Sequence, residues 1–397
     1  MGIRALRHKR SRQRWLWTFE TVTKLRFSEF ARNALGVAAV GAVVLQPTIA
    51  SAAPVVVGSG PGVFTVNAAN ARWRLNNDVS FTTTSSANGF NEGDLNVGGP
   101  NQQTDAFDGA LSWLINGAQY RSGTGTLDVT VDGAGATTVN SPLVPLTGLT
   151  QLPPPGIPHQ AAPVPNLNVG IQTYFSNTNA VARSILILQN PTGSPITVNV
   201  LNANNLGSDS NTRIVATTDG NATFNPGTDF WAVSWQFNAA PPPLPAPETS
   251  DPIVTMVFGE AGAAVQPTFA GPASAPADGN DNPGFAYNVT IPAGATRRLM
   301  AFVQLSESRV AATADAAVFN STAALGGTDY LAGMSPAERS EVVNWTFAAA
   351  ASVPTLGEWS MIGLGGLLGL SAYAIIRRRY SLAADHVDSS RWTGAAR

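Results

Sequence analysis

The sequence contains no cysteine at any of its 397 positions. Without cysteine there is no disulfide framework, no thiolate nucleophile and no metal site built on sulfur. The folded state must therefore depend on a hydrophobic core, and a chain of this length can bury one large core or two medium ones.

Lysine and histidine are scarce in the central part of the chain. Between Ala53 and Ser352 there are nine arginines, no lysine and 20 acidic residues, a net charge of −11, and the single histidine is His159. This composition disfavours a Cys-His pair, a Schiff-base lysine and a histidine-based zinc site, and its sign disfavours nucleic acid as a partner. We therefore expect a protein that is not an enzyme and has no cofactor, although hydrolysis by two carboxylates remains chemically open.

Residues 1–52 have the three parts of a secretory signal peptide. Nine Lys or Arg residues in positions 1–33 face only Glu20 and Glu29, an apolar run extends from Ala34 to Leu45, and Ala50-Ser51-Ala52 has the small-x-small pattern of a cleavage site. We expect cleavage after Ala52 and export of the chain from Ala53 onward. A retained N-terminal anchor is the alternative.

An uncharged run of 18 residues, from Trp359 to Ile376, lies near the C-terminus and is followed by Arg377, Arg378 and Arg379. As a helix it would extend roughly 27 Å, close to the apolar thickness of a bilayer. The arginines would remain in the cytoplasm and Trp359 would lie at the opposite interface. We expect a transmembrane helix over 359–376, a cytoplasmic tail over 380–397, and everything before the helix outside the cytoplasm.

The residues around the start of this run, Val353-Pro354-Thr355-Leu356 and Trp359, resemble the IPTL-CTERM sorting signal of Gram-negative bacteria, a relative of the PEP-CTERM signal. That signal combines I-P-T-L-x-x-W-G, an apolar helix and a basic cluster. The resemblance covers 353–379, departs mildly at Val353 and Ser360, and leaves a longer tail than usual. It implies processing by an exosortase, a membrane-embedded cysteine transpeptidase, of a precursor held in the inner membrane. A permanently anchored, periplasm-facing protein is the alternative.

Between the two signals the sequence has the pattern of an all-β protein. Short apolar runs alternate with Gly, Pro and Asn turns such as Asp108-Gly109 and Asn190–Pro195, and Leu127–Val131 alternates apolar and polar side chains. This pattern predicts antiparallel β-sandwich modules. The expected strands are 64–66, 79–83, 111–115, 127–131, 167–175, 181–189, 196–201, 212–217, 229–235, 253–258, 285–291 and 297–305.

Residues 151–165 hold six prolines. Proline removes the backbone donor that a sheet ladder needs and favours a stiff extended spacer. The stretch predicts a boundary between a β-rich module at 53–150 and a second β-sandwich module at 166–348. A long loop inside one sandwich remains the alternative.

A short helix is expected near the end of the second module. Ser335-Pro336-Ala337-Glu338 places Ser at the N-cap, Pro at the first helical position and Glu three residues after the cap, which is a capping box. Val342–Phe347 is then expected as the last strand.

Two acidic groups are candidates for a hard cation such as calcium. Asp278, Asn280 and Asn282 place oxygen ligands at alternating positions, and a second cluster has similar standing. A solvated turn is the simpler interpretation of the first group, so no metal site is predicted. The second cluster consists of Glu92, Asp94, Asp105 and Asp108.

Aromatic residues offer one route to a binding function. Trp231, Trp235 and Phe237 would share one face of a strand with Val233. Exposed, they would form a platform for sugars; buried, they would be part of the core, which is the commoner case.

Taken together, these features predict an exported bacterial protein of the cell surface or extracellular matrix with a structural or adhesive role. Its expected partners are an exosortase-type transpeptidase, the inner membrane, and exopolysaccharide or other matrix. A carbohydrate-binding surface module is the alternative from another class.

Overall fold

A computed structural model of the protein describes residues 63–76, 90–119, 128–131, 137–146, 163–225, 227–237, 249–271, 283–347 and 356–391. Several predictions fall outside these residues. They are the signal peptide with Ala50 and Ala52, the strand at 79–83, His159, the candidate ligands Asp278, Asn280 and Asn282, and Val353, Pro354 and Thr355 of the sorting motif.

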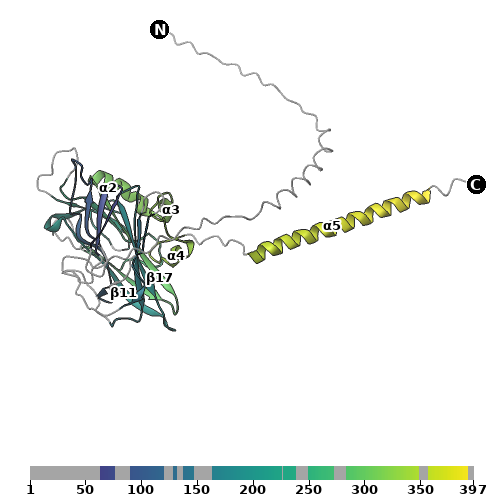
Figure 1. Ribbon diagram of the computed structural model, residues 1–397, viewed down its shortest axis with the longest axis horizontal. Coiled ribbons are helices and arrows are strands. Elements are labelled where there is room, and N and C mark those ends of the chain that lie inside the picture. Colours follow the sequence, from purple (N-terminus) through teal and green to yellow (C-terminus); the bar gives the residue numbers. More distant parts are fainter. Residues whose placement is uncertain are drawn as a thin grey trace, which may run out of the picture. The chain divides into compact units, whose positions relative to one another are not determined.

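The described β-strands form two antiparallel sheets (Figure 1). The first has the order β1-β2-β3-β4-β11-β16-β15, with β5 paired to β4. Its strands are β1 Val63–Ala68, β2 Ala71–Asn76, β3 Phe90–Leu95, β4 Phe107–Ile115, β5 Ala118–Gln119, β11 Ile196–Leu206, β15 Phe269–Gly271 and β16 Gly284–Ile291.

The second sheet has the order β12-β13-β14-β17-β10-β9-β7-β6, with β8 paired to β9. Its strands are β6 Asp128–Val131, β7 Thr137–Asn140, β8 Val144–Pro145, β9 Asn168–Phe175, β10 Val181–Gln189, β12 Thr212–Thr217, β13 Trp231–Gln236, β14 Ile253–Val257 and β17 Thr296–Ser306. The expected antiparallel all-β architecture is therefore present.

Both sheets combine strands from the two sides of the proline-rich stretch. In the first sheet β4 pairs with β11, and in the second β7 and β8 pair with β9. Hydrogen bonds thus join the stretches predicted as modules 53–150 and 166–348.

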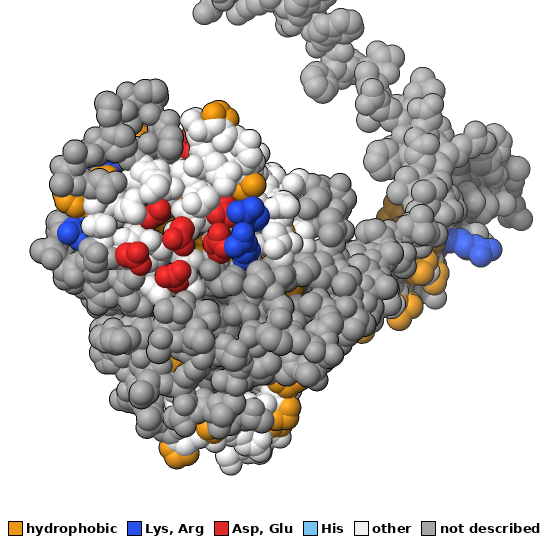
Figure 2. Space-filling view, turned by 60° about the vertical axis from the view of Figure 1, so that its left-hand side comes forward, with side chains coloured by type: hydrophobic (Ala, Val, Ile, Leu, Met, Phe, Trp, Pro, Cys, Tyr) orange, Lys and Arg blue, Asp and Glu red, His pale blue; other side chains and the backbone are white. Residues whose placement is uncertain are grey.

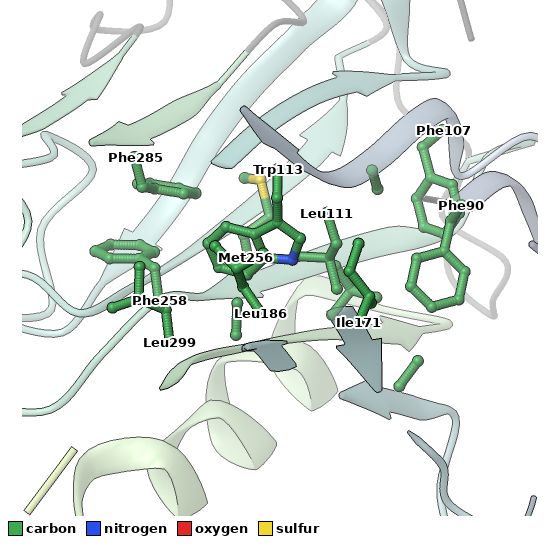
Figure 3. Packing of buried hydrophobic residues seen from close by; sticks show 14 of the residues in the cluster. Phe90, Phe107, Leu111, Trp113, Ile171, Leu186, Met256, Phe258, Phe285 and Leu299 are labelled. Atoms are coloured by element: carbon green, nitrogen blue, oxygen red, sulfur yellow. The ribbon is translucent and has the colours of Figure 1, made fainter. Parts of the chain in front are cut away.

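The main hydrophobic core lies between the two sheets, because each sheet turns one apolar face toward the other. Figure 3 shows Trp113 of β4, Leu186 of β10 and Met256 of β14 side by side in this core. The Trp113 indole donates to the Ser184 hydroxyl of β10 (3.0 Å), which satisfies its polar atom across the sheets. At one side Phe258 stacks on Phe285, with ring centroids 3.7 Å apart.

The outer face of the second sheet is covered by short helices. Along β17, Leu299, Ala301 and Val303 belong to the core between the sheets, whereas Met300 and Phe302 belong to a second cluster beneath the helices. The helical elements are α2 Arg309–Ala316, η2 Ala317–Asn320, α3 Thr322–Leu325 and α4 Pro336–Glu341, and η1 Asp209–Asn211 precedes β12.

The predicted capping box of the last of these helices is confirmed. Ser335 is the N-cap of α4, its hydroxyl accepts from the Glu338 backbone amide, and the Glu338 carboxylate accepts from the Ser335 backbone amide (2.8 Å). Pro336 occupies the first turn, where its missing N–H is not needed.

Two local predictions are wrong. Asp108 and Gly109 lie inside β4 and do not form a turn. Val342–Phe347 is not a strand, although Val342 makes a single bridge to Arg298. In place of a ladder, the side chain of Asn344 bonds to the backbone of β17 and to Phe258. A side chain thereby takes over the pairing that a strand's backbone would make.

The C-terminal helix α5 spans Leu356–Arg391 and confirms a helix over the apolar run, although it continues past the predicted end. Its apolar side chains from Met361 to Ile376 are largely exposed, for example Met361 at 73% and Leu370 at 69%. Within the described residues, no helix combines the length and the apolar character that crossing a membrane requires.

Candidate functional site

The aromatic stripe of β13 does not form an exposed platform. Trp231 and Trp235 are 4% and 7% exposed and belong to the cluster beneath the helices. Trp231 donates its indole N–H to Asn320 (2.8 Å), and Arg309 lies 3.9 Å above the Trp235 ring. Only Phe237 is exposed, and its ring stands at 85° to that of Trp235. This geometry fits core packing and not the stacking of a sugar ring.

The predicted acidic cluster is divided between two ion pairs and the more exposed Asp105 and Asp108. Asp94 is fully buried and accepts from Arg72 Nε (2.5 Å), and Glu92 pairs with Arg74. Asp105 has its pKa raised, first by burial and then by the charges of Asp108, Asp209 and Asp94. Within the described residues, no group of three or more His, Cys, Asp or Glu side chains is placed to hold a metal ion.

Asp251 is a buried neighbour of these acidic residues. Burial raises its pKa to about 6, against a hydrogen bond from Ser250 that lowers it, and the charges of Asp105 and Asp209 raise it further. Its Oδ2 atom is buried and has no donor among the described residues. On the face shown in Figure 2, acidic side chains gather in one region beside a few basic ones, in keeping with the acidic surplus of this part of the chain.

A buried arginine holds the helical layer to the second sheet. Arg183 of β10 is fully buried, donates to the carbonyl oxygens of Tyr330 (2.6 Å) and Ala332 (3.1 Å), and lies 4.9 Å from the centre of the Tyr174 ring. Burial lowers its pKa to about 9. These contacts bind backbone carbonyls of the chain itself, so they assign Arg183 a structural role.

A cleft of about 720 Å³ lies at one end of the two sheets, among the described residues. Its walls are the β1–β2 turn, the segment after β3, the β9–β10 turn and the residue after β17. Its polar lining consists of five asparagines and one carboxylate: Asn67, Asn70, Asn96, Asn101, Asn177 and Glu307. The remaining lining residues are small or apolar: Ala68, Ala69, Ala71, Val97, Gly99 and Pro100.

The β1–β2 turn gives the cleft one fixed wall. Ala68 pairs with Ala71, and the two residues between them, Ala69 and Asn70, have positive φ angles of 48° and 63°. Positive φ at both central residues is the geometry of a type I′ turn, the two-residue turn that matches the twist of a hairpin. Asn70 is therefore held at the mouth of the cleft by the hairpin itself.

The segment after β3 is closed on itself and tied to the other sheet. Leu95 and Gln103 exchange backbone hydrogen bonds at its base (2.9 and 3.0 Å), and the Gln102 side chain accepts from the Gly98 amide (2.9 Å). The Asn96 amide group then donates to Glu307 (2.7 Å), which directly follows β17. One side-chain bond thus joins the two sheets across the cleft.

The lining residues of the cleft were not predicted from the sequence. Their only local signal is the density of asparagine in turns, as in Asn67-Ala-Ala-Asn70 and in Asn96–Asn101. Asn177 and Glu307 lie far away in the chain and reach the cleft only through the pairing of β9, β10 and β17. Of the predicted site residues, the structure brings Asp94 and Asp108 near Asp105, whereas Glu92 pairs with Arg74.

One short segment of the chain matches a known family. The family model of the IPTL-CTERM motif matches residues 351–379, so the resemblance of the C-terminal segment is confirmed. The matched range begins four residues after Phe347, the last described residue before α5. The search of curated proteins gives no match.

Solved structures show only a distant likeness. A galactose mutarotase-like protein from Lactobacillus casei is 10% identical, with 62% of this chain and 100% of that chain covered and a TM-score of 0.33. A galactose mutarotase related enzyme from Lactobacillus acidophilus is 7% identical, with 62% and 97% covered and a TM-score of 0.27. A protein from Synechocystis is 9% identical, with 63% and 98% covered and a TM-score of 0.32. Similarity at this level carries no argument about activity.

Proposed function

We propose that this is an exported bacterial surface or matrix protein whose precursor is held in the inner membrane and is processed by an exosortase-type transpeptidase. The observation that carries the proposal is the IPTL-CTERM motif at 351–379. The motif follows the two β-sheets and their helical layer, whose described residues lie within 63–347 and are called the body below. In this proposal the motif serves as the sorting signal of an exported protein, and the body serves as its cargo.

The exposed apolar surface of α5 supports contact with a membrane in this proposal, although no described helix has the length and apolar character to cross one. Eight large apolar side chains between Met361 and Ile376 are each more than half exposed, at 52% to 73%. A contiguous apolar surface of this kind is typical of an interaction with a membrane or a partner. The arginines that follow, Arg377 to Arg379, would hold the segment's end in the cytoplasm.

A structural or adhesive role fits the body better than catalysis. Of the acidic residues singled out above, Glu92 and Asp94 form ion pairs and Asp251 is buried, and the central region has no lysine and a single histidine. The two sheets and the helical layer bury an extensive core instead. Such a body can persist outside the cell without disulfides because burial of apolar surface stabilises it.

The test is mass spectrometry of both termini of the protein, taken from the cell envelope and from the medium, in cells with and without the exosortase. We expect a mature form that begins near Ala53 and ends between residues 353 and 359 only when the enzyme is present. Pro354→Ala combined with Thr355→Ala should accumulate the precursor, whereas Ser381→Ala, outside the matched range, should be processed normally. Peptides from 380–397 in the mature protein of enzyme-containing cells would establish a permanent anchor and overturn the sorting proposal.

A further inference from the structure

The asparagine side chains of the cleft offer a particular hydrogen-bonding chemistry. Each amide presents one acceptor oxygen and two N–H donors, and five of them line the cleft together with one carboxylate. Hydroxyl groups both donate and accept. A ligand that carries several neighbouring hydroxyls can therefore satisfy the donors and the acceptors of this lining at once.

The charge of the lining excludes other classes of ligand. No lysine or arginine is among the described residues that line the cleft, so a phosphate or a carboxylate would find no cation there to pair with. The one acidic residue, Glu307, already accepts from Asn96. A single carboxylate gives little attraction for a cation and falls short of the six to eight oxygen ligands of a calcium site. The lining favours an uncharged ligand.

The small and apolar residues of the cleft complete the match. Ala68, Val97 and Pro100 lie among the amides and provide C–H surface without an aromatic ring. A saccharide ring has hydroxyls at its edge and C–H groups on its faces, so it needs both kinds of surface. The volume of about 720 Å³ lies within the range of roughly 300–1,000 Å³ that is usual for small-molecule sites.

The cleft is also built before any ligand arrives. The type I′ turn fixes Asn70, the Leu95–Gln103 bridge closes the segment after β3, and the Asn96–Glu307 bond joins the two sheets. Fixed donors and acceptors lower the entropic cost of binding. Loops at the end of a sandwich are where such scaffolds commonly carry their binding residues.

We propose that this cleft binds an uncharged saccharide, and that it is the site through which the body adheres to neutral polysaccharide. The inference rests on the adhesive role proposed above. The site lies apart from the buried tryptophans of β13.

The experiment measures binding of short neutral glucan, galactan and mannan oligosaccharides to the purified full-length chain, by ligand-observed NMR and calorimetry. The chain is kept in a detergent without a sugar headgroup, and no exosortase is present. A failure of sorting in cells therefore leaves this measurement unaffected, and a failure of binding leaves the sorting result unaffected. Oligogalacturonate serves as the anionic probe and spermidine as the cationic one.

Asn70→Gly and Asn101→Ala test the cleft. Glycine allows the positive φ of position 70 and removes the side chain that carries the amide, and Asn101 is exposed. Each variant should weaken binding of a neutral oligosaccharide about 3- to 10-fold, the value of one net hydrogen bond. Asn288→Ala, which removes an exposed asparagine from β16 outside the cleft lining, should leave binding unchanged. Circular dichroism establishes that each variant is folded.

Glu307→Gln tests whether the negative charge of the cleft contributes to binding. The variant removes that charge and retains an oxygen that can accept from Asn96. Binding of a neutral oligosaccharide should weaken by no more than about 3- to 10-fold, as in the asparagine variants, because a single contact is altered. The proposal is overturned if no neutral oligosaccharide binds at millimolar concentration, if binding survives Asn70→Gly and Asn101→Ala unchanged, or if only oligogalacturonate or only spermidine binds.

Discussion

Replacing Asp251 by asparagine is expected to stabilise the protein at neutral pH. The Asp251 side chain is buried, with the residue 7% exposed, and only its Oδ1 atom has a hydrogen bond, from Ser250 (3.0 Å). Its Oδ2 atom is buried without a donor among the described residues. Ionisation at this position places a charge in a poorly solvated site near Asp105 and Asp209, and asparagine keeps the shape while removing the charge.

The magnitude follows from the pKa. Burial and the neighbouring acids raise the pKa of Asp251 from 3.8 to about 6 in the folded state. At about 1.4 kcal/mol per pKa unit, ionisation of this group costs the folded state about 3 kcal/mol above pH 6. Between pH 3.8 and 6 the folded state binds more protons than the unfolded state, so the free energy of unfolding falls as pH rises through this window.

The assay is urea unfolding at a series of pH values from about 4 to 8, monitored by tryptophan fluorescence, in wild type and in Asp251→Asn. We expect the variant to be about 2–3 kcal/mol more stable than wild type at pH 7.5 and to lose most of that advantage near pH 4. Glu307→Gln removes one charge at an exposed position and controls for net charge. A stability difference between Asp251→Asn and wild type that does not change between pH 4 and 8 would refute the reasoning.

Three further substitutions test the packing of the body by the same unfolding assay. Asn344→Ala should cost about 3 kcal/mol or more, since it leaves buried backbone groups without the three bonds that the side chain makes, and Asn288→Ala should cost less than about 0.5 kcal/mol. Gly207→Ala should prevent folding or cost several kcal/mol, because the added Cβ would overlap the Asp105 carbonyl oxygen; a fully folded, equally stable variant would contradict the close approach. Ser335→Ala should cost about 1 kcal/mol through loss of the capping box, and an unchanged midpoint would show that α4 contributes little to the stability of the body.

Local pattern predicted individual strands well. The expected ranges 181–189 and 212–217 are those of β10 and β12, because turn residues bound both segments and their interiors are rich in β-branched and long apolar side chains. Prediction failed where pairing is made by distant residues. Val342–Phe347 has the composition of a strand, yet Asn344 bonds to β17 through its side chain and the segment makes only one bridge.

The alternation of Trp231, Val233 and Trp235 correctly placed these residues on one face of a strand. Whether that face met solvent depended on the helices that follow β17, from which Asn320 bonds to Trp231 and Arg309 covers Trp235. The alternation of residues within β13 does not show whether its tryptophan face is exposed or buried. The sequence of β13 therefore allowed a sugar-stacking platform. The structure excludes it, because a segment about 80 residues further along the chain packs over the two tryptophans.

The sequence by itself determined the destination signal and the class of the fold. The IPTL-CTERM motif depends on adjacent residues, and antiparallel strands depend on alternation and turn chemistry, so both can be read along the chain. Only the tertiary structure decided that residues on both sides of the proline-rich stretch share two sheets, and that Asn70, Asn96, Asn177 and Glu307 line one cleft. The reason is that strand order is set by long-range pairing and by burial of two sheet faces against each other, for which neighbouring residues carry no signal.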